Sequence, residues 1–216
     1  MKTPEISGYR YSGTDCGCVH EYVLPAVSRN LNDQAIKEKR VFDLGCGNGS
    51  VAAWLATQGY SVVGVDPSET GIAVAKRSFP SLNLNVGSSY DPLHEIYGTF
   101  PAVVSLEVIE YVYAPRSFAK CVNQLLEPGG IALISTPYHC YTKNLALAIT
   151  GKLDAHFTAL WDHGHIKFWS VKTITSLFAE QGLRVRKVVR VGRIPMLAKS
   201  MLLVVEKPRV AESESV

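Results

Sequence analysis

The chain has 216 residues, of which 47% are hydrophobic and 19% charged, and this suits a single domain with a full core. No apolar run approaches the ~20 residues that a membrane span needs, and the N-terminus lacks the apolar stretch of a secretory signal. These features exclude a membrane-spanning protein and predict a cytoplasmic location. The five cysteines include no C-x-x-C pair, which favours reduced thiols, and a metal site at Cys16-Gly-Cys18-Val-His20 is the alternative.

Apolar, β-branched runs alternate with helical patterns along the chain, as is typical of an α/β domain with a mostly parallel sheet. The strands are expected at 40–44, 61–65, 82–86, 102–106 and 131–135, with a turn at 127–130 before the last of these. Residues 184–191 and 201–205 should add an antiparallel pair. The helices are expected at 50–58, 69–79, 115–126 and 171–181, where Ser170 is the N-cap of the last one and Gly182 its stop.

Two regions depart from this alternation. Residues 1–38 form an N-terminal helical cap, with a helix at about 19–37, ahead of the main domain at 39–209. Residues 137–170 are far longer than the usual connection of roughly 2–6 residues, so they predict a lid insert beside the carboxyl ends of the strands. Residues 210–216 are expected to be a disordered tail.

A glycine-rich loop, Asp43-Leu-Gly-Cys-Gly-Asn-Gly49, follows the first expected strand and precedes a helix. In doubly wound sheets ligands bind at this point, and glycines allow a ligand to approach the backbone. Asp66 ends the second strand, where a carboxylate can accept hydrogen bonds from ribose hydroxyls. The alternative is a tight strand–helix turn without a ligand.

The details of the loop favour a cationic cofactor over a dinucleotide. A dinucleotide fingerprint reads G-x-G-x-x-G, whereas this loop reads G-x-G-x-G. Asp43 would repel a pyrophosphate but attract the ammonium and sulfonium groups of S-adenosylmethionine. None of the tyrosines has a lysine four residues on, so the Tyr-x-x-x-Lys pair of short-chain dehydrogenases is absent.

Four segments resemble class I S-adenosylmethionine-dependent methyltransferases. Val41-Phe-Asp-Leu-Gly-Cys-Gly-Asn-Gly-Ser50 resembles motif I of that family, and Val63-Gly-Val-Asp66 resembles motif II. The next two motifs are similar to Val103-Val-Ser-Leu-Glu-Val-Ile-Glu-Tyr-Val112 and Leu126-Glu-Pro-Gly-Gly-Ile-Ala-Leu-Ile-Ser-Thr136, most of all as found in ubiquinone-biosynthesis O-methyltransferases and the methyltransferase type 11 group. The resemblance covers about 38–136 well and 165–190 loosely.

This resemblance implies a Rossmann-like, doubly wound seven-stranded sheet, mostly parallel with an antiparallel last strand. It also implies S-adenosylmethionine as cofactor and S-adenosylhomocysteine as product. The implied cofactor residues are Asp43, Gly45 and Gly47 near the methionine part, Asp66 on the ribose, Pro67 on the adenine, Ser88 and Ser89 after the third strand, and Ser105 and Leu106 through backbone groups. Many relatives have an acid where Ser88 stands, and Asp91 is a nearby substitute.

The residues after the fourth strand bear on the acceptor. Nucleic-acid amino-methyltransferases place Asn/Asp-Pro-Pro-Tyr there to hold a flipped base, but this chain has Ser105-Leu-Glu-Val, which disfavours a nucleic-acid substrate. The ubiquinone-type relatives have Glu-x-x-Glu-His, proposed there to hold a divalent metal, whereas this chain has Glu107, Glu110 and Tyr111. We predict no metal site and expect an acidic pair that faces solvent, although two carboxylates could bind Mg²⁺ weakly.

The expected lid carries four of the six histidines: His139, His156, His163 and His165. A hydroxyl acceptor benefits from a general base, and each histidine can instead be structural. His139 is the first candidate because it lies three residues beyond the fifth strand, and His165 is the second. We also expect the N-terminal segment around Tyr9, Tyr11, His20 and Tyr22 to help close the acceptor pocket.

Three functions are consistent with these patterns. The first is an S-adenosylmethionine-dependent O-methyltransferase that acts on a small hydroxylated or phenolic molecule. The second is a methyltransferase for RNA or another polyanion, because 184–209 holds eight basic residues and only one acidic residue. The third is a non-catalytic S-adenosylmethionine-binding module. The sequence does not identify the acceptor or the oligomeric state.

Overall fold

The computed structural model describes residues 11, 13–14, 19–33, 38–157, 159–194 and 197–209. Several sequence predictions lie outside these residues: Tyr9, Cys16 and Cys18, the side chain of His20, and the tail at 210–216. No described helix has the length and apolar character to span a membrane.

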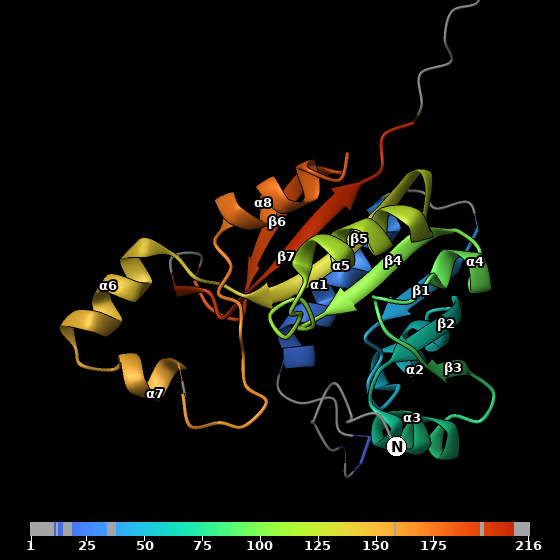
Figure 1. The fold of residues 1–216 in the computed structure, drawn as a ribbon, viewed down its shortest axis with the longest axis horizontal. Coiled ribbons are helices and arrows are strands. Elements are labelled where there is room, and N and C mark those ends of the chain that lie inside the picture. The colour runs from blue at the N-terminus through green and yellow to red at the C-terminus, as the bar shows by residue number, and fades with distance from the viewer. Residues whose placement is uncertain are drawn as a thin grey trace, which may run out of the picture.

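A seven-stranded sheet forms the centre of the molecule, in the order β3-β2-β1-β4-β5-β7-β6 (Figure 1). Only β7 runs antiparallel to its neighbours, between β5 and β6. The predicted doubly wound sheet with an antiparallel last strand is therefore confirmed. The strands are β1 (Arg40–Leu44), β2 (Ser61–Asp66), β3 (Asn83–Val86), β4 (Phe100–Leu106), β5 (Leu126–Pro137), β6 (Arg184–Val191) and β7 (Ser200–Glu206).

Helices cover both faces of the sheet. One layer contains α1 (Val19–Asp33), α2 (Ser50–Thr57) and α3 (Glu69–Ser78), whose side chains join one buried apolar cluster. The opposite layer contains α4 (Leu93–Tyr97), α5 (Pro115–Leu125) and α8 (Val171–Ala179), which join a second cluster. Two further helices, α6 (Tyr141–Ile149) and α7 (Leu153–Phe157), lie in the 137–170 insert.

Strand β5 shows why the central strands have almost continuous apolar sequences. Ile131 and Leu133 are buried in the α1–α2–α3 layer, whereas Ala132 and Ile134 are buried in the opposite layer. A strand that is covered on both faces needs apolar side chains at successive positions. The same arrangement brings the carboxyl ends of β1, β2, β4 and β5 to one edge of the sheet.

The start of β5 corrects the sequence prediction. We expected a turn at 127–130, but the strand begins at Leu126 and continues through these residues. The register against β4 shifts between Phe100 and Ala102, so the extra residues are taken up as a bulge. A Cβ on Gly130 would lie 2.9 Å from the Glu127 carbonyl oxygen and 3.0 Å from that of Pro101, so only glycine allows the strands to approach this closely.

Helices α6 and α7 extend beyond the carboxyl end of β5, away from the two helical layers (Figure 1). This is where the lid was expected. In contrast, α1 packs on β6 and β7 and buries Val23, Val27 and Leu31 there. Helix α1 is thus part of a layer, and the described N-terminal residues that reach the glycine loop are Tyr11 and Gly13, whose carbonyl oxygen accepts a hydrogen bond from Asn48 at 2.8 Å.

Candidate functional site

The glycine loop after β1 has the left-handed backbone that its sequence predicts. Gly45, Gly47 and Gly49 have φ angles of 87°, 52° and 79°, which side chains disfavour. The N–H groups of Gly45 and Cys46 donate to the carbonyl oxygen of Val65 at 2.8 and 3.0 Å. These bonds fix the loop against the end of β2.

Two close neighbours explain why Gly45 and Gly47 must lack side chains. A Cβ on Gly45 would lie 2.5 Å from Cγ2 of Val108, the second residue after β4. A Cβ on Gly47 would lie 2.5 Å from the hydroxyl oxygen of Tyr11. The loop is therefore bordered by the residues that follow β4 on one side and by Tyr11 on the other.

Asp66 connects the glycine loop to the end of β2. Its Oδ2 accepts a hydrogen bond from the N–H of Gly47 at 2.9 Å, and its Oδ1 accepts one from the N–H of Ser68 at 2.8 Å. Each carboxylate oxygen can accept further bonds, so a ligand hydroxyl can still bind to this group. The backbone bonds hold the carboxylate in place before any ligand arrives.

Asp43 is buried beside Asp66 and lacks a full set of partners. Its side chain is 1% exposed, and its Oδ2 accepts no hydrogen bond. Burial, and then the charge of Asp66, raise the pKa of Asp43 to about 8. A cationic ligand would favour the ionised form and lower this pKa. The pair therefore fits a ligand that combines hydroxyl groups with a positive charge, as S-adenosylmethionine does.

The other predicted cofactor residues lie along the same edge. Pro67 directly follows Asp66, and Ser88 donates its N–H to Oδ2 of Asp91 at 2.7 Å. The hydroxyl of Ser105 donates to the Leu44 carbonyl oxygen at 2.6 Å, so this side chain joins β4 to β1. Any contact between Ser105 and a ligand would consequently involve its backbone. The side chains of Ser89 and Leu106 are partly buried.

The acidic residues after β4 do not form the solvent-facing pair that we expected. Glu110 is 1% exposed, and neither of its carboxylate oxygens has a hydrogen-bond partner. Glu107 is partly buried, and its Oε1 accepts a bond from the hydroxyl of Ser135 at 2.8 Å. The expectation was wrong because the apolar residue Ile109, which is fully buried, draws this turn inward.

This pair does not reproduce the metal-binding set of the ubiquinone-type enzymes. Tyr111 stands in place of the histidine, and its ring packs edge-on against His165 at 4.9 Å between centroids. Among the described residues, no three His, Cys, Asp or Glu side chains are placed to hold a metal ion together. The residues present thus do not fit a divalent metal with the family's ligands.

His139 lies at the start of the insert, inside an aromatic cluster. Its ring stacks on Phe157 at 6.0 Å and meets Phe168 edge-on at 5.3 Å, and His156 lies 5.6 Å away. Burial is the main cause that lowers the pKa of His139 to about 4. Burial also lowers the pKa of His165. The structure therefore brings His139 and His156 together, and it places His165 beside Tyr111.

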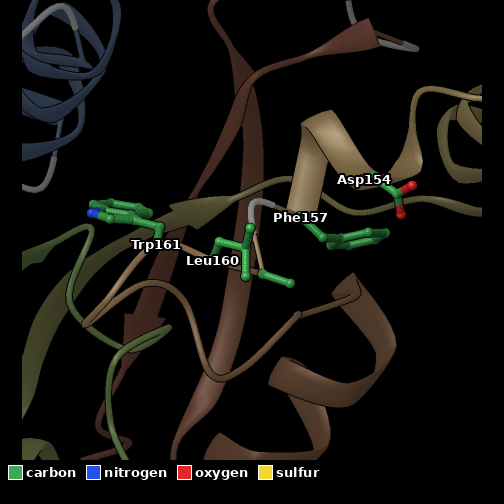
Figure 2. Close-up of a pocket in the computed structure, with 5 residues that line it drawn as sticks. Asp154, Phe157, Leu160 and Trp161 are labelled. Carbon is green, nitrogen blue, oxygen red and sulfur yellow. The ribbon is translucent and has the colours of Figure 1, made fainter.

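The insert also forms a hollow of about 530 Å³ on its outer side (Figure 2). Figure 2 shows Trp161 and Asp154 at opposite ends of this hollow, with Leu160 between them. Leu160 is 99% exposed and Trp161 45% exposed, so the hollow is open. It is lined by Asp154, Phe157, Ala159, Leu160 and Trp161.

Comparisons with known proteins agree with the geometry of the glycine loop. A family model described as "Methyltransferase domain" matches residues 19–188. The chain is 29% identical to the human "Ubiquinone biosynthesis O-methyltransferase, mitochondrial" over 178 residues, which cover 79% of this chain and 48% of that protein. It is 31% identical to the ubiquinone biosynthesis O-methyltransferase of Dinoroseobacter shibae over 154 residues, 68% of this chain and 60% of that protein. The chain thus spans about half to three fifths of the length of these two relatives.

Solved structures show the same fold. The magnesium protoporphyrin IX methyltransferase of Synechocystis PCC 6803, crystallised with S-adenosylhomocysteine, has a TM-score of 0.63 at 18% identity and covers 86% of this chain and 81% of its own. The PH0226 protein of Pyrococcus horikoshii has a TM-score of 0.65 at 21% identity and covers 88% of this chain and 89% of its own. At these identities the likeness supports the fold alone.

Proposed function

Because this chain belongs to the methyltransferase-domain family, whose class I members use S-adenosylmethionine, we propose that it transfers the methyl group to a hydroxyl oxygen of a small molecule. The observation that carries the proposal is the pair Asp43 and Asp66 at the glycine loop. One carboxylate is held by the Gly47 N–H, and the other is buried without a full set of partners. The O-methyltransferase relatives support oxygen as the acceptor atom.

The roles of the cofactor residues follow from their chemistry. Asp66 would bind the ribose hydroxyls, and Asp43 would face the positive charge of the methionine part. Gly45 and Gly47 leave the backbone open, and Pro67, Ser88 and Ser89 would border the adenine. Ser105 and Leu106 would border the methionine end from β4. When bound, the cofactor supplies an activated methyl group, so the protein has mainly to orient the acceptor and exclude water.

The insert at 137–170 would form the acceptor pocket, together with Tyr11. The aromatic cluster around His139 supports this role because it joins the two ends of the insert, at His139 and Phe168, to Phe157 of α7. A phenolic acceptor suits such a wall, since aromatic rings stack in offset or edge-on geometry. His139 and His165 stay candidates for the general base. The division into an N-terminal cap and a domain at 39–209, and a cytoplasmic location, also stay predictions.

A polyanionic substrate is the second candidate, but the basic residues of 184–209 have other contacts. Arg186 pairs with Glu206 at 3.2 Å, and the guanidinium of Arg190 lies 5.1 Å from the ring centre of Tyr138. Lys207 donates to the carbonyl oxygens of Asn123 and Leu126 at 2.8 Å. Charged side chains also protect an edge strand such as β6 from pairing with other chains. These contacts favour the small molecule.

The test is to measure binding and turnover with the full chain. Calorimetry should show binding of S-adenosylhomocysteine and no binding of NADH. A set of catechols and phenols, incubated with S-adenosylmethionine, should release S-adenosylhomocysteine and yield an O-methyl product by mass spectrometry. Binding of NADH in place of S-adenosylhomocysteine would disprove the cofactor assignment. Cofactor binding without turnover of any hydroxylated acceptor would favour a non-catalytic binding module.

A further inference from the structure

Glu107 lies at the point where β4, β5 and the glycine loop meet. Its N–H donates to Ser135 of β5, to the carbonyl oxygen at 3.1 Å and to the hydroxyl at 3.0 Å. The side chain of the next residue, Val108, would clash with a Cβ on Gly45. The carboxylate therefore starts from backbone that borders the loop where the methyl donor binds in the proposed function.

The backbone of Glu107 is strained. Its φ is 54°, a left-handed conformation that few non-glycine residues adopt. Such a conformation persists only where the surroundings impose it, and it is concentrated at functional sites. Here the two bonds to Ser135 impose it, while the Ser135 hydroxyl also donates to the Glu107 carboxylate at 2.8 Å. The hydroxyl of Ser135 thus fixes both the backbone N–H and the carboxylate of Glu107.

Glu110 is an acidic neighbour of Glu107, and it is fully buried. The other groups that face Glu107 are the hydroxyls of Ser135 and Ser200, so no cation among its described neighbours compensates two negative charges. Burial raises the pKa of Glu107 to about 7, and burial together with the charge of Glu107 raises the pKa of Glu110 well above its usual range. Two carboxylates in such a site keep one proton between them.

We propose that Glu107 is the general base of the reaction and that Glu110 keeps the one proton that the pair holds, in place of the metal that relatives are proposed to bind. This inference rests on the proposed function. The acceptor oxygen forms a bond to the methyl carbon, and the carbon–sulfur bond breaks with its electron pair moving to sulfur. The hydroxyl proton moves to the Glu107 carboxylate and from there to solvent, so charge and atoms balance.

Glu107 meets two requirements of a base better than His139 does. It directly precedes Val108, which borders the glycine loop, whereas His139 lies among the rings of Phe157, Phe168 and His156 in the insert. A base works best when its pKa lies near the working pH, and the buried imidazole of His139 is far more acidic than that.

The first test needs no acceptor. Infrared difference spectra between the full chain and Glu107→Gln, recorded from pH 5 to 9, should show a protonated carboxyl group that disappears with a midpoint near 7. Glu95→Gln removes an exposed carboxylate, 70% accessible, and is the matched control. A Glu107 carboxyl that is fully ionised at pH 5.5 would refute the proposal. Loss of the protonated band on addition of MgCl₂ alone would also refute it, in favour of a cation site.

The second test uses phenols of graded acidity. Glu107→Gln should lower the rate by about 10²–10⁴-fold for weakly acidic phenols and hardly at all for 4-nitrophenol, which is already ionised at pH 8.5. A uniform loss across the series, or the graded pattern in His139→Ala instead, would overturn the assignment. If the wild type methylates no phenol, the proposed function is wrong as stated, whereas the infrared titration still decides the state of the carboxylate pair.

Discussion

Among single residues, Asp66 contributes most to the cofactor site because it joins the loop, β2 and the ligand. Asp66→Ala removes the acceptors for the N–H groups of Gly47 and Ser68 and for the ribose hydroxyls. We expect weaker binding of S-adenosylhomocysteine by about 1.5–3 kcal/mol, the scale of lost hydrogen bonds to a charged group. Calorimetry measures this, with Asp162→Ala on the exposed part of the insert as control. Equal affinities in the two variants would remove Asp66 from the site.

Gly47 allows a steric effect to be separated from backbone strain. Gly47→Ala places a Cβ 2.5 Å from the Tyr11 hydroxyl at a φ of 52°, whereas Gly59→Ala places one no nearer than 3.5 Å to its closest neighbour, Nζ of Lys39, at a φ of 83°. Both variants should lose about 1–2 kcal/mol of stability from the left-handed backbone. Only Gly47→Ala should also lose binding of S-adenosylhomocysteine, by at least tenfold in calorimetry. Equal binding losses would show that strain, and not obstruction at the loop, is responsible.

At the scale of elements, the sequence predicts the strands and helices whose apolar side chains repeat with the period of a buried element. The positions of β1 to β5 along the chain could be predicted, because their apolar runs end at recognisable residues such as the glycine loop and Asp66. Helices α6 and α7 could not, because both lie outside the central core and have no fully buried residue of their own. The burial of Glu110 was missed for a related reason. Its neighbour Thr136 comes from β5, about 25 residues away, and no local sequence pattern indicates that contact.

The insert should behave as a separately mobile element that the aromatic cluster holds in place. The end of the insert that leads into α8 is fixed by the N–H groups of Ile166 and Lys167, which donate to the Glu110 carbonyl oxygen at 3.0 and 2.9 Å. The α6–α7 part instead depends on ring contacts of Phe157 with His139 and Phe168.

We therefore expect Phe157→Ala to speed amide exchange across α6 and α7 at least tenfold, with little change in the sheet. Hydrogen-exchange mass spectrometry measures this, and Leu160→Ala, at a side chain 99% exposed, is the matched control. In the wild type, S-adenosylhomocysteine should slow exchange across 137–170. Identical exchange in both variants, or no effect of the ligand, would contradict a lid that closes over the site.

At the scale of the whole molecule, one edge of the sheet gathers buried acids and buried imidazoles whose effects on stability oppose each other. The carboxyl groups of Asp43, Glu107 and Glu110 all have raised pKa values. His139, His156 and His165 of the insert have lowered ones, chiefly because of burial. These groups bind protons differently in the folded and unfolded states. They should therefore determine much of how the free energy of unfolding of the whole domain depends on pH.

The sign of each contribution predicts that stability falls as the pH rises from 6.5 to 8, where no histidine opposes the acids. The folded state holds protons on Asp43 and Glu107 up to about pH 8 and 7, whereas the unfolded state releases them near 3.8 and 4.5, so each carboxyl group loses stability as the pH rises between its two values. His139 stays neutral in the folded state down to about pH 4 but gains a proton near 6.5 when unfolded, so stability is lost as the pH falls below 6.5.

Thermal unfolding of the full chain between pH 4.5 and 9 measures this profile. Each proton bound in only one state changes the free energy of unfolding by about 1.4 kcal/mol per pH unit. Asp43→Asn should make the loss of stability with rising pH less steep all the way up to pH 8, and His139→Gln should change the profile only below about pH 6.5. Glu95→Gln, at an exposed carboxylate, is the control. An alkaline slope that Asp43→Asn leaves intact would show that Asp43 is ionised in the folded protein at neutral pH. In that case a positively charged group must already neutralise it, and the argument for its attraction to a cationic cofactor would fail.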